Sequence, residues 1–385
     1  MPWKEMCAVD QRLRFIAAVN ESDETFSELC RQFGISRKTG YKWCKRYEQF
    51  GPAGLEDRAP IPRSCPHATP PEMLDRILEL RKERPTWGPK KLRARLLALG
   101  YEGVPAASTI GDLLKKHGLI RPRRRRVYPP FVPSPIQVPE QPNDTWCVDF
   151  KGHFALGDGS RCHPLTITDE VSRYLLKCEG LAKADETSVQ PHFDRAFREF
   201  GLPRRIRSDN GPPFATAGIG GLSKLSVHWI KLGIHPERIE PGKPEQNGRH
   251  ERMHKTLKEE TTKPPAATLS EQQRRFDRFR HIYNDERPHE ALGQKPPASV
   301  YTPSPRPMPR EPRSPEYPDT MTVRKLDASG RLQFGGDNTL VTRLLANEPV
   351  GLLPIDDGVW ELYYGPVLLA QVTLRSKELR LQKVR

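Results

Sequence analysis

The sequence lacks several features that would place it in familiar classes of protein. Its seven cysteines never stand at the Cys-x-x-Cys spacing of a zinc site, and an odd number cannot pair completely within one chain. No apolar run approaches the roughly 18 residues of a membrane span, and the N-terminal stretch resembles no signal peptide. A Gly-x-x-x-x-Gly-Lys phosphate loop is also absent. We therefore expect a cytoplasmic protein with reduced thiols that uses neither a membrane nor ATP.

Acidic residues are fewer than basic residues. The 385 residues include 63 Lys and Arg against 48 Asp and Glu, which gives a net charge of +15 at pH 7 and a pI of about 9.6. Such an excess of positive charge is typical of proteins that bind polyanions. The expected partner is nucleic acid, which in a bacterial cell would make the protein nucleoid-associated.

Proline, in contrast, is abundant, and two proline-rich stretches divide the chain at 121–142 and 299–318. Such segments favour extended conformations and are predicted to act as semi-rigid linkers. At this length a chain can form two to four domains. The predicted domains are two helical units at 1–60 and 66–120, a mixed α/β region at 143–298, and a small all-β region at 319–385.

The first helical unit contains a turn and a helix start in "FGIS", where Ser36 can act as the N-cap. The helix that follows carries the basic residues Arg37, Lys38 and Lys42 beside aromatic residues. This pattern resembles a helix-turn-helix whose recognition helix starts at Ser36. A helical hairpin with a solvated basic face is the alternative.

The second helical unit is predicted to contain helices near 71–83, 88–99 and 107–117. Pro89 stands where the first turn of a helix tolerates proline, and Gly118 is a candidate C-cap. We interpret it as a second helix-turn-helix unit, with a purely structural helical domain as the alternative.

An arginine run, "RPRRRR", follows this unit and includes Arg123, Arg124 and Arg125. Charge runs are often only solvated or disordered. Between a DNA-binding unit and an extended linker, however, this run suits phosphate contacts or insertion into the minor groove.

The middle region alternates strands and helices. Strands are predicted at 145–150, 162–169, 173–181 and 204–211 and near 235–240, with helices at 186–201 and from about 247 and 270. Three strands before the first helix predict an antiparallel meander joined to parallel strands, which is an α/β layer fold.

Two aspartates in this region are candidate catalytic residues. Asp149 lies in the otherwise apolar strand "TWCVDF", where a buried carboxylate without a partner would be costly, and a metal ion is one good partner. Asp209 ends the "RRIRSD" strand just before an Asn-Gly turn. A single aspartate there is usually a turn residue, but two in these contexts, followed by a helix that bears glutamate, indicate a carboxylate site.

Five blocks within residues 143–300 carry a resemblance to a known family. They are "WCVDFKGHF", "TITDEVSRY", "FGLPRRIRSDNGPPF", "GKPEQNGRHERMHKTLK" and "YNDERPHEAL". In this order they resemble the integrase-core transposases of bacterial insertion sequences, which are relatives of retroviral integrases. The resemblance implies a ribonuclease-H-like fold and a triad of two aspartates and one glutamate that holds two Mg²⁺ or Mn²⁺ ions.

The identity of the third carboxylate is ambiguous in the sequence. Glu245 follows Asp209 after 35 intervening residues, the spacing most associated with this family, and Glu251 follows after 41. The family pattern of proline, polar residues, glycine, two residues and glutamate selects Glu251 instead. A rotation of 100° per residue also places Glu251 on one helix face with Lys255 and Lys258, and Met253 and Leu257 on the opposite side, where they can pack inward. We therefore assign Glu251 as catalytic and the two lysines as DNA contacts.

The resemblance further implies a function. It predicts a transposase that binds the terminal inverted repeats of a mobile element, frees a 3′ hydroxyl and joins it to target DNA, acting as a homo-oligomer on DNA. A ribonuclease-H-type nuclease and a sequence-specific regulator are the alternatives. Short apolar runs separated by turns predict that 319–385 form a small β-barrel, which could bind DNA, contact another subunit or only stabilise the fold.

Overall fold

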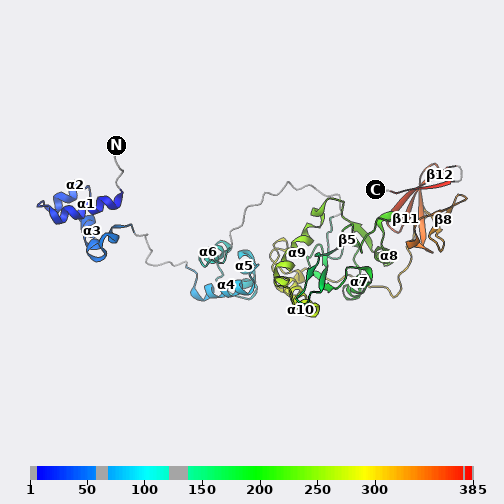
Figure 1. Ribbon diagram of the computed structural model, residues 1–385, viewed down its shortest axis with the longest axis horizontal. Coiled ribbons are helices and arrows are strands. Elements are labelled where there is room, and N and C mark those ends of the chain that lie inside the picture. Colours follow the sequence, from blue (N-terminus) through cyan, green and yellow to red (C-terminus); the bar gives the residue numbers. More distant parts are fainter. Residues whose placement is uncertain (1–6, 58–67, 121–137, 376–377, 384–385) are drawn as a thin grey trace. The chain divides into compact units, whose positions relative to one another are not determined.

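The computed structural model describes residues 7–57, 68–120, 138–375 and 378–383. The chain divides into two compact units, Met1–Ala68 and Thr69–Arg385. Figure 1 labels their helices and strands and colours them along the sequence. Within the described ranges, no helix combines the length and the apolar character that crossing a membrane requires.

The first unit is built from three helices. They are α1 (Ala8–Glu21), α2 (Phe26–Gln32) and α3 (Arg37–Phe50), followed by the 3-10 turn η1 (Gly51–Leu55). The predicted cap is confirmed, because Ser36 Oγ accepts a hydrogen bond from the backbone N–H of Thr39 at 3.2 Å. Gly34 has a φ of 65°, a left-handed conformation that glycine adopts at little cost and that allows the tight turn before α3.

The second helical module opens the larger unit and has its own small core. Its helices are α4 (Pro71–Glu83), α5 (Pro89–Ala98) and α6 (Ala107–Lys116), within one or two residues of the predicted bounds. Proline is the first residue of both α4 and α5, where the missing N–H costs nothing. The side chains that fill the core between the helices include Ile77, Trp87, Leu92, Ile110 and Leu114.

The α/β core contains one mixed sheet. Its strands are β1 (Thr145–Phe150), β2 (Phe154–Ala155), β3 (Arg161–Asp169), β4 (Leu175–Leu181), β5 (Arg205–Ser208) and β6 (His235–Arg238). The order is β2-β3-β1-β5-β6, with β4 also paired to β3. Strands β1, β3 and β4 pair antiparallel, while β1, β5 and β6 pair parallel. The predicted meander joined to parallel strands is therefore confirmed.

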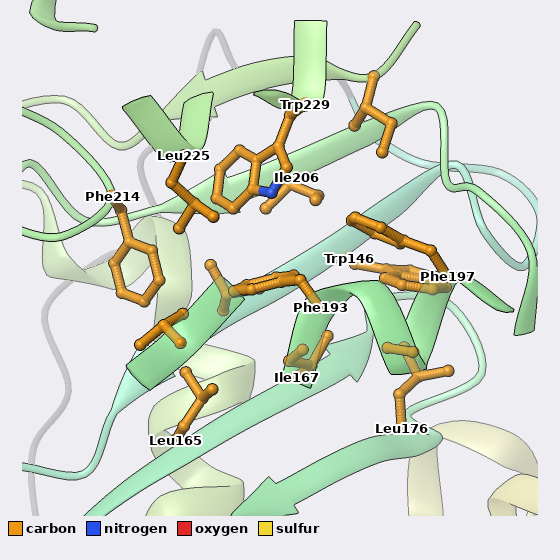
Figure 2. Close-up of a cluster of buried hydrophobic side chains, with 14 of the residues drawn as sticks. Trp146, Leu165, Ile167, Leu176, Phe193, Phe197, Ile206, Phe214, Leu225 and Trp229 are labelled. Atoms are coloured by element: carbon orange, nitrogen blue, oxygen red, sulfur yellow. The ribbon is translucent and has the colours of Figure 1, made fainter. Parts of the chain in front are cut away.

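One face of this sheet is apolar. Helices α7 (Glu186–Phe200) and α8 (Lys224–Lys231) contribute to the cluster that covers it. Figure 2 shows Trp146, Ile167 and Ile206 of the sheet together with Phe193 and Trp229 of these helices. Successive strand residues point to opposite faces, so the alternate residues of β1 and β3 face the other way. The sequence analysis missed α8, which begins just after the glycines at 218, 220 and 221.

The opposite face of the sheet carries polar residues and is covered by α9 (Gly248–Thr261) and α10 (Leu269–His281). Met253 and Leu257 of α9 are 3% and 0% exposed and pack with α10. A π-helical turn (Ile282–Glu286) follows. The remaining short helices are 3-10 turns at Ile219–Gly221, Pro244–Asn247, Glu290–Leu292, Pro297–Ser299 and Arg343–Leu345.

The second helical module contacts this part of the core through charged side chains. The carboxylate of Glu286 accepts hydrogen bonds from Arg84 at 2.9 Å and lies 3.2 Å from a nitrogen of Arg95. The ammonium of Lys91 donates to the carbonyl oxygen of Pro288 at 2.5 Å, and burial lowers the pKa of Lys91 to about 7. The module is therefore joined to the core by an electrostatic contact.

The second proline-rich stretch lies along the core rather than apart from it. Tyr301 stacks on Tyr174 with ring centroids 4.4 Å apart. The backbone N–H of Ser304 donates to Phe200, and the carbonyl oxygen of Arg306 accepts from Leu202 at 2.7 Å. An extended segment leaves its backbone groups available for such bonds, so this stretch acts here as a strap on the surface of the core.

The C-terminal region is all β, as predicted, but the described strands do not close into the expected barrel. Strands β10 (Pro349–Asp356), β11 (Val359–Tyr364), β12 (Val367–Arg375) and β13 (Glu378–Lys383) form an antiparallel sheet with β7 (Thr322–Lys325), and β8 (Arg331–Phe334) pairs only with β9 (Asp337–Leu340). Val227 and Ile230 of α8 belong to the core of this sheet. Because α8 of the α/β core helps cover the apolar face of the C-terminal sheet, that sheet can bury this face without closing on itself.

Candidate active site

Asp149 lies on the polar face of the sheet. Trp146 and Val148 of β1 are fully buried in the apolar cluster, so the alternating pattern directs Cys147 and Asp149 toward α9. Asp149 pairs in register with Thr166 of β3. The strand therefore presents a carboxylate beneath the helix that carries Glu251.

Burial, together with the negative charges of Asp209 and Glu251, raises the pKa of the Asp149 carboxyl to about 7 against the opposing effects of a backbone hydrogen bond and of Lys151. The Asp149 side chain is 24% exposed. A carboxylate that is desolvated and repelled by two other carboxylates is stabilised by a cation. The donor set thus fits a hard divalent metal ion.

Asp209 follows β5 directly and is half-buried, and burial raises the pKa of its carboxyl. Its Oδ1 accepts a hydrogen bond from the backbone N–H of Gly211 at 3.3 Å. The Asn210 side chain donates to the carbonyl oxygen of Ile239 at 2.7 Å. The predicted Asn-Gly turn therefore anchors the end of β5 against the segment after β6.

Glu251 and Glu245 occupy different elements. Glu251 is an exposed residue in the first turn of α9, on the face of Lys255 and Lys258, while Met253 and Leu257 point inward as predicted. Glu245 lies in the 3-10 turn that precedes α9. The negative charge of Glu251 acts on Asp149, because it contributes to the raised pKa of that carboxyl. Among the described residues, no three His, Cys, Asp or Glu side chains already stand in a compact metal-binding group.

Two histidines of α9, which the sequence analysis missed, lie behind Asp149. His250 and His254 are 2% and 3% exposed, and both place Nε2 within 2.7 Å of the Thr166 hydroxyl oxygen. His250 Nδ1 also lies 2.7 Å from the hydroxyl of Thr168. Burial lowers the pKa of His250 to about 3 and lowers the pKa of His254 further, so both rings are neutral.

The hydrogen atoms of this network can be counted. The single Thr166 hydroxyl proton is directed to the Asp149 carbonyl oxygen at 3.1 Å, so both histidines donate Nε2–H to Thr166. The Nδ1 of His254 then carries a lone pair and faces Asp149 Oδ2 at 3.6 Å. That arrangement favours a protonated Asp149, in agreement with its raised pKa. One sequence feature could have identified the two histidines as buried. With Met253 and Leu257 they stand at the i, i+3, i+4, i+7 spacing of a single helix face.

A second buried network also escaped the sequence analysis. Glu170, just after β3, accepts hydrogen bonds from Arg207 of β5 at 2.5 Å and from Arg249 of α9 at 3.2 Å. Arg207 also donates to Glu237 of β6 at 2.6 Å. Because charged residues at strand ends are usually solvated, nothing in the sequence distinguished these from surface residues.

The candidate DNA contacts of the first unit lie on one face of α3. Arg37, Lys38 and Lys42 are exposed, as is Tyr41, which stacks on Phe26 with ring centroids 4.3 Å apart. A row of basic side chains around an exposed aromatic ring on the helix after the turn suits docking in a groove. The other predicted DNA contacts, Arg123, Arg124 and Arg125, lie outside the described residues.

Four family models match the chain. Models described as "Integrase core domain" match residues 139–244 and 232–297. A "Helix-turn-helix domain" model matches residues 11–64, and a "Homeodomain-like domain" model matches residues 39–114.

Curated relatives come from insertion elements. The chain is 29% identical over 220 residues to the "Insertion element IS407 uncharacterized 31.7 kDa protein" of Burkholderia multivorans, which covers 56% of this chain and 76% of that protein. It is 31% identical over 181 residues to the "Insertion element IS476 uncharacterized 39.2 kDa protein" of Xanthomonas euvesicatoria, covering 46% of this chain and 50% of that protein.

Among solved structures, the chain is similar to the HTLV-2 integrase catalytic core domain in complex with magnesium, with a TM-score of 0.34 and 17% identity over 42% of this chain and 98% of that one. The assignment comes from the family models and the insertion-element relatives. A matched integrase core preceded by helix-turn-helix domains, together with the insertion-element relatives, supports an insertion-element DDE transposase, which is a polynucleotidyl transferase.

Proposed function

We propose that this transposase binds the terminal inverted repeats of its element as a homo-oligomer, cleaves to free a 3′ hydroxyl, and joins that hydroxyl to target DNA. The proposal rests above all on the raised pKa of Asp149, a carboxyl that is desolvated and repelled by Asp209 and Glu251. Such a cluster is costly in the absence of a cation, and proteins retain costly charge where chemistry needs it.

The residues that would hold the metal ions are Asp149, Asp209 and Glu251. Their oxygen atoms favour Mg²⁺ or Mn²⁺ over zinc. When bound, the two ions would supply activation of the attacking oxygen and stabilisation of the leaving oxygen, so that no covalent nucleophile on the protein is needed.

The protein's own contribution is placement. The exposed face of α3 would read the element end, and Lys255 and Lys258 lie on the face of α9 that also bears Glu251. Ammonium groups beside the carboxylates would hold the phosphodiester backbone by its charge. Attack by a 3′ hydroxyl forms a new phosphodiester bond as the old P–O bond breaks, and the departing oxygen leaves as the other 3′ end.

The experiment separates Glu251 from Glu245. Purified Glu251→Gln should lose Mg²⁺-dependent cleavage and joining of a labelled terminal-repeat duplex while still binding it, because glutamine keeps the shape but not the anionic ligand. The matched control Glu245→Gln should remain active, with at most about 0.3 to 1 kcal/mol of stability lost through the helix dipole.

The variants Asp149→Asn and Asp209→Asn should behave like Glu251→Gln. An inactive Glu245→Gln beside an active Glu251→Gln would show that the simple spacing from Asp209 was the better guide. Cleavage without joining by the wild-type protein would instead favour a nuclease.

A further inference from the structure

One buried carboxylate joins the two elements that carry the second and third candidate metal ligands. Glu170 is 7% exposed and lies in the turn between β3 and β4. Its Oε2 accepts from Arg207 at 2.5 Å, and its Oε1 accepts from Arg249 at 3.2 Å. Arg207 precedes Asp209 by two residues on β5, and Arg249 precedes Glu251 by two residues on α9.

Just before α9, Gln246 exchanges two hydrogen bonds with Glu240, which ties the start of the helix to the segment after β6 but not to β5. Within the described residues, its N-cap residue Asn247 makes no side-chain capping hydrogen bond. The inner face is held by His250 and Met253, but these contacts lie behind the helix and do not tie its first turn to β5. The Glu170–Arg249 bond is the contact that spans from the sheet to the outer side of this turn.

The far end of the network is firmly anchored. Arg207 is 3% exposed, lies in register with Cys147 of β1, and donates Nε–H to Glu237 of β6 at 2.6 Å. Two carboxylates and two guanidinium groups therefore alternate in this network, in the order of contact Glu237, Arg207, Glu170 and Arg249. The opposite charges of these four side chains balance, which is the condition under which buried ions are tolerated.

We propose that Glu170 is a positioning residue for the transposition chemistry. It holds the first turn of α9 at a fixed place relative to β5 and so sets the separation of Glu251 from Asp209. The inference rests on the proposed function of those two carboxylates. Because metal ligands must be placed to within a fraction of an ångström, loss of a supporting contact typically reduces metal affinity or activity roughly 10- to 100-fold.

The key test uses Arg249, because its side chain is 54% exposed and its replacement should leave folding intact. Arg249→Gln should weaken Mn²⁺ binding, measured by electron paramagnetic resonance without DNA, by roughly 10-fold. It should also lower the cleavage rate at saturating DNA by a similar factor, with unchanged affinity for the DNA. Arg249→Lys, which keeps a cation that can reach Glu170, should recover most of both.

Two further variants separate positioning from stability. Glu170→Gln and the matched control Glu237→Gln each remove one carboxylate partner of Arg207, so similar losses of unfolding midpoint are expected. Only Glu170→Gln disconnects Arg249, and only it should reduce the rate at saturating DNA. In the double variant Glu170→Gln/Arg249→Gln, the rate should be no lower than in Glu170→Gln alone.

Several results would overturn the proposal. One is an Arg249→Gln protein with wild-type Mn²⁺ binding and a wild-type saturated rate. Another is loss of DNA affinity alone, which would make Arg249 a DNA contact. Because Mn²⁺ binding is measured without DNA, a wild-type protein that binds Mn²⁺ tightly and never cleaves would refute the proposed function while leaving the positioning role testable.

Discussion

At the scale of single residues, the site is organised by the cost of burying charge. Asp149 is placed where burial removes most of its solvation and where Asp209 and Glu251 repel it. The neutral His254 faces the same carboxyl at 3.6 Å with a ring that burial keeps uncharged. The metal-free site therefore favours a proton on Asp149, which a cation must displace.

A pH dependence of stability follows from this. The carboxyl has an ordinary pKa of 3.8 when unfolded and about 7 when folded, so the folded protein binds the extra proton between these values. The stabilising effect is complete below pH 4 and is lost as the pH rises through 7. In metal-free buffer, wild-type protein should lose about 2 to 3 kcal/mol relative to Asp149→Asn between pH 5 and pH 8.

Calorimetric unfolding of both proteins at the two pH values measures this difference. Addition of Mg²⁺ at pH 8 should stabilise the wild-type protein and not Asp149→Asn. Parallel stability curves for the two proteins would mean that Asp149 titrates normally.

At the scale of elements, α9 and α3 each have one buried face and one exposed face. In α9, Met253 and Leu257 bury one side while Glu251, Lys255 and Lys258 occupy the other. In α3, the inner side packs closely because Gly40 offers no Cβ, which would lie 2.8 Å from the sulfur of Cys30. The outer sides are thereby left for DNA.

The outer side of α3 gives a second prediction. Replacing Arg37 and Lys38 with alanine should weaken binding to the cognate element end far more than binding to random DNA, because contacts to base edges carry sequence information. Both side chains are exposed, so folding should be unaffected. Fluorescence anisotropy with the two duplexes measures the ratio.

The control is Arg14→Ala, which removes an exposed charge from α1 rather than from α3. It should cause only a small loss that is equal on both duplexes. An equal loss on both duplexes for the α3 variant would reduce Arg37 and Lys38 to phosphate contacts.

At the scale of the larger unit, separate modules are held together by polar surface contacts. Glu286 of the core pairs with Arg84 and Arg95 of the second helical module, and Lys91 becomes buried in the same contact. Exposed and half-exposed ion pairs each contribute only about 0.2 to 1 kcal/mol. Ile282 of the core also packs against the hydrophobic cluster of the module, and Glu260 accepts a hydrogen bond from Thr86, so a charge reversal at Glu286 weakens the contact rather than abolishing it.

Glu286→Lys should weaken this contact, because it places a third cation beside Arg84 and Arg95. Acylation of Lys91, measured by mass spectrometry against the exposed Lys82 of α4 in the same protein, should rise roughly 10-fold, the equivalent of about 1.4 kcal/mol. The matched control Glu79→Lys makes the same charge change at a residue that pairs only locally with Arg76. Equal acylation in both variants would show that Glu286 does not hold the module.

The sequence by itself determined the elements and the order of the blocks, because these depend on local signals. The apolar run TWCVDF, the Ser36 cap and Pro89 at the start of α5 act within a few residues, so the predictions made from them were confirmed. The inward direction of Met253 and Leu257 followed from helix geometry alone. The choice of Asp149, Asp209 and Glu251 as metal ligands was also made from the sequence and stays a prediction.

Only the tertiary structure decided which polar residues support that site. Thr166 is far in the sequence from His250 and His254. They meet because α9 packs on the face of the sheet to which Thr166 of β3 points. Glu170, Arg207 and Arg249 meet for the same reason. The C-terminal sheet stays open because α8, a helix that glycine-rich neighbours concealed, covers part of its apolar face. Contacts between distant segments leave no periodic trace in a single sequence, so no local pattern could have predicted them.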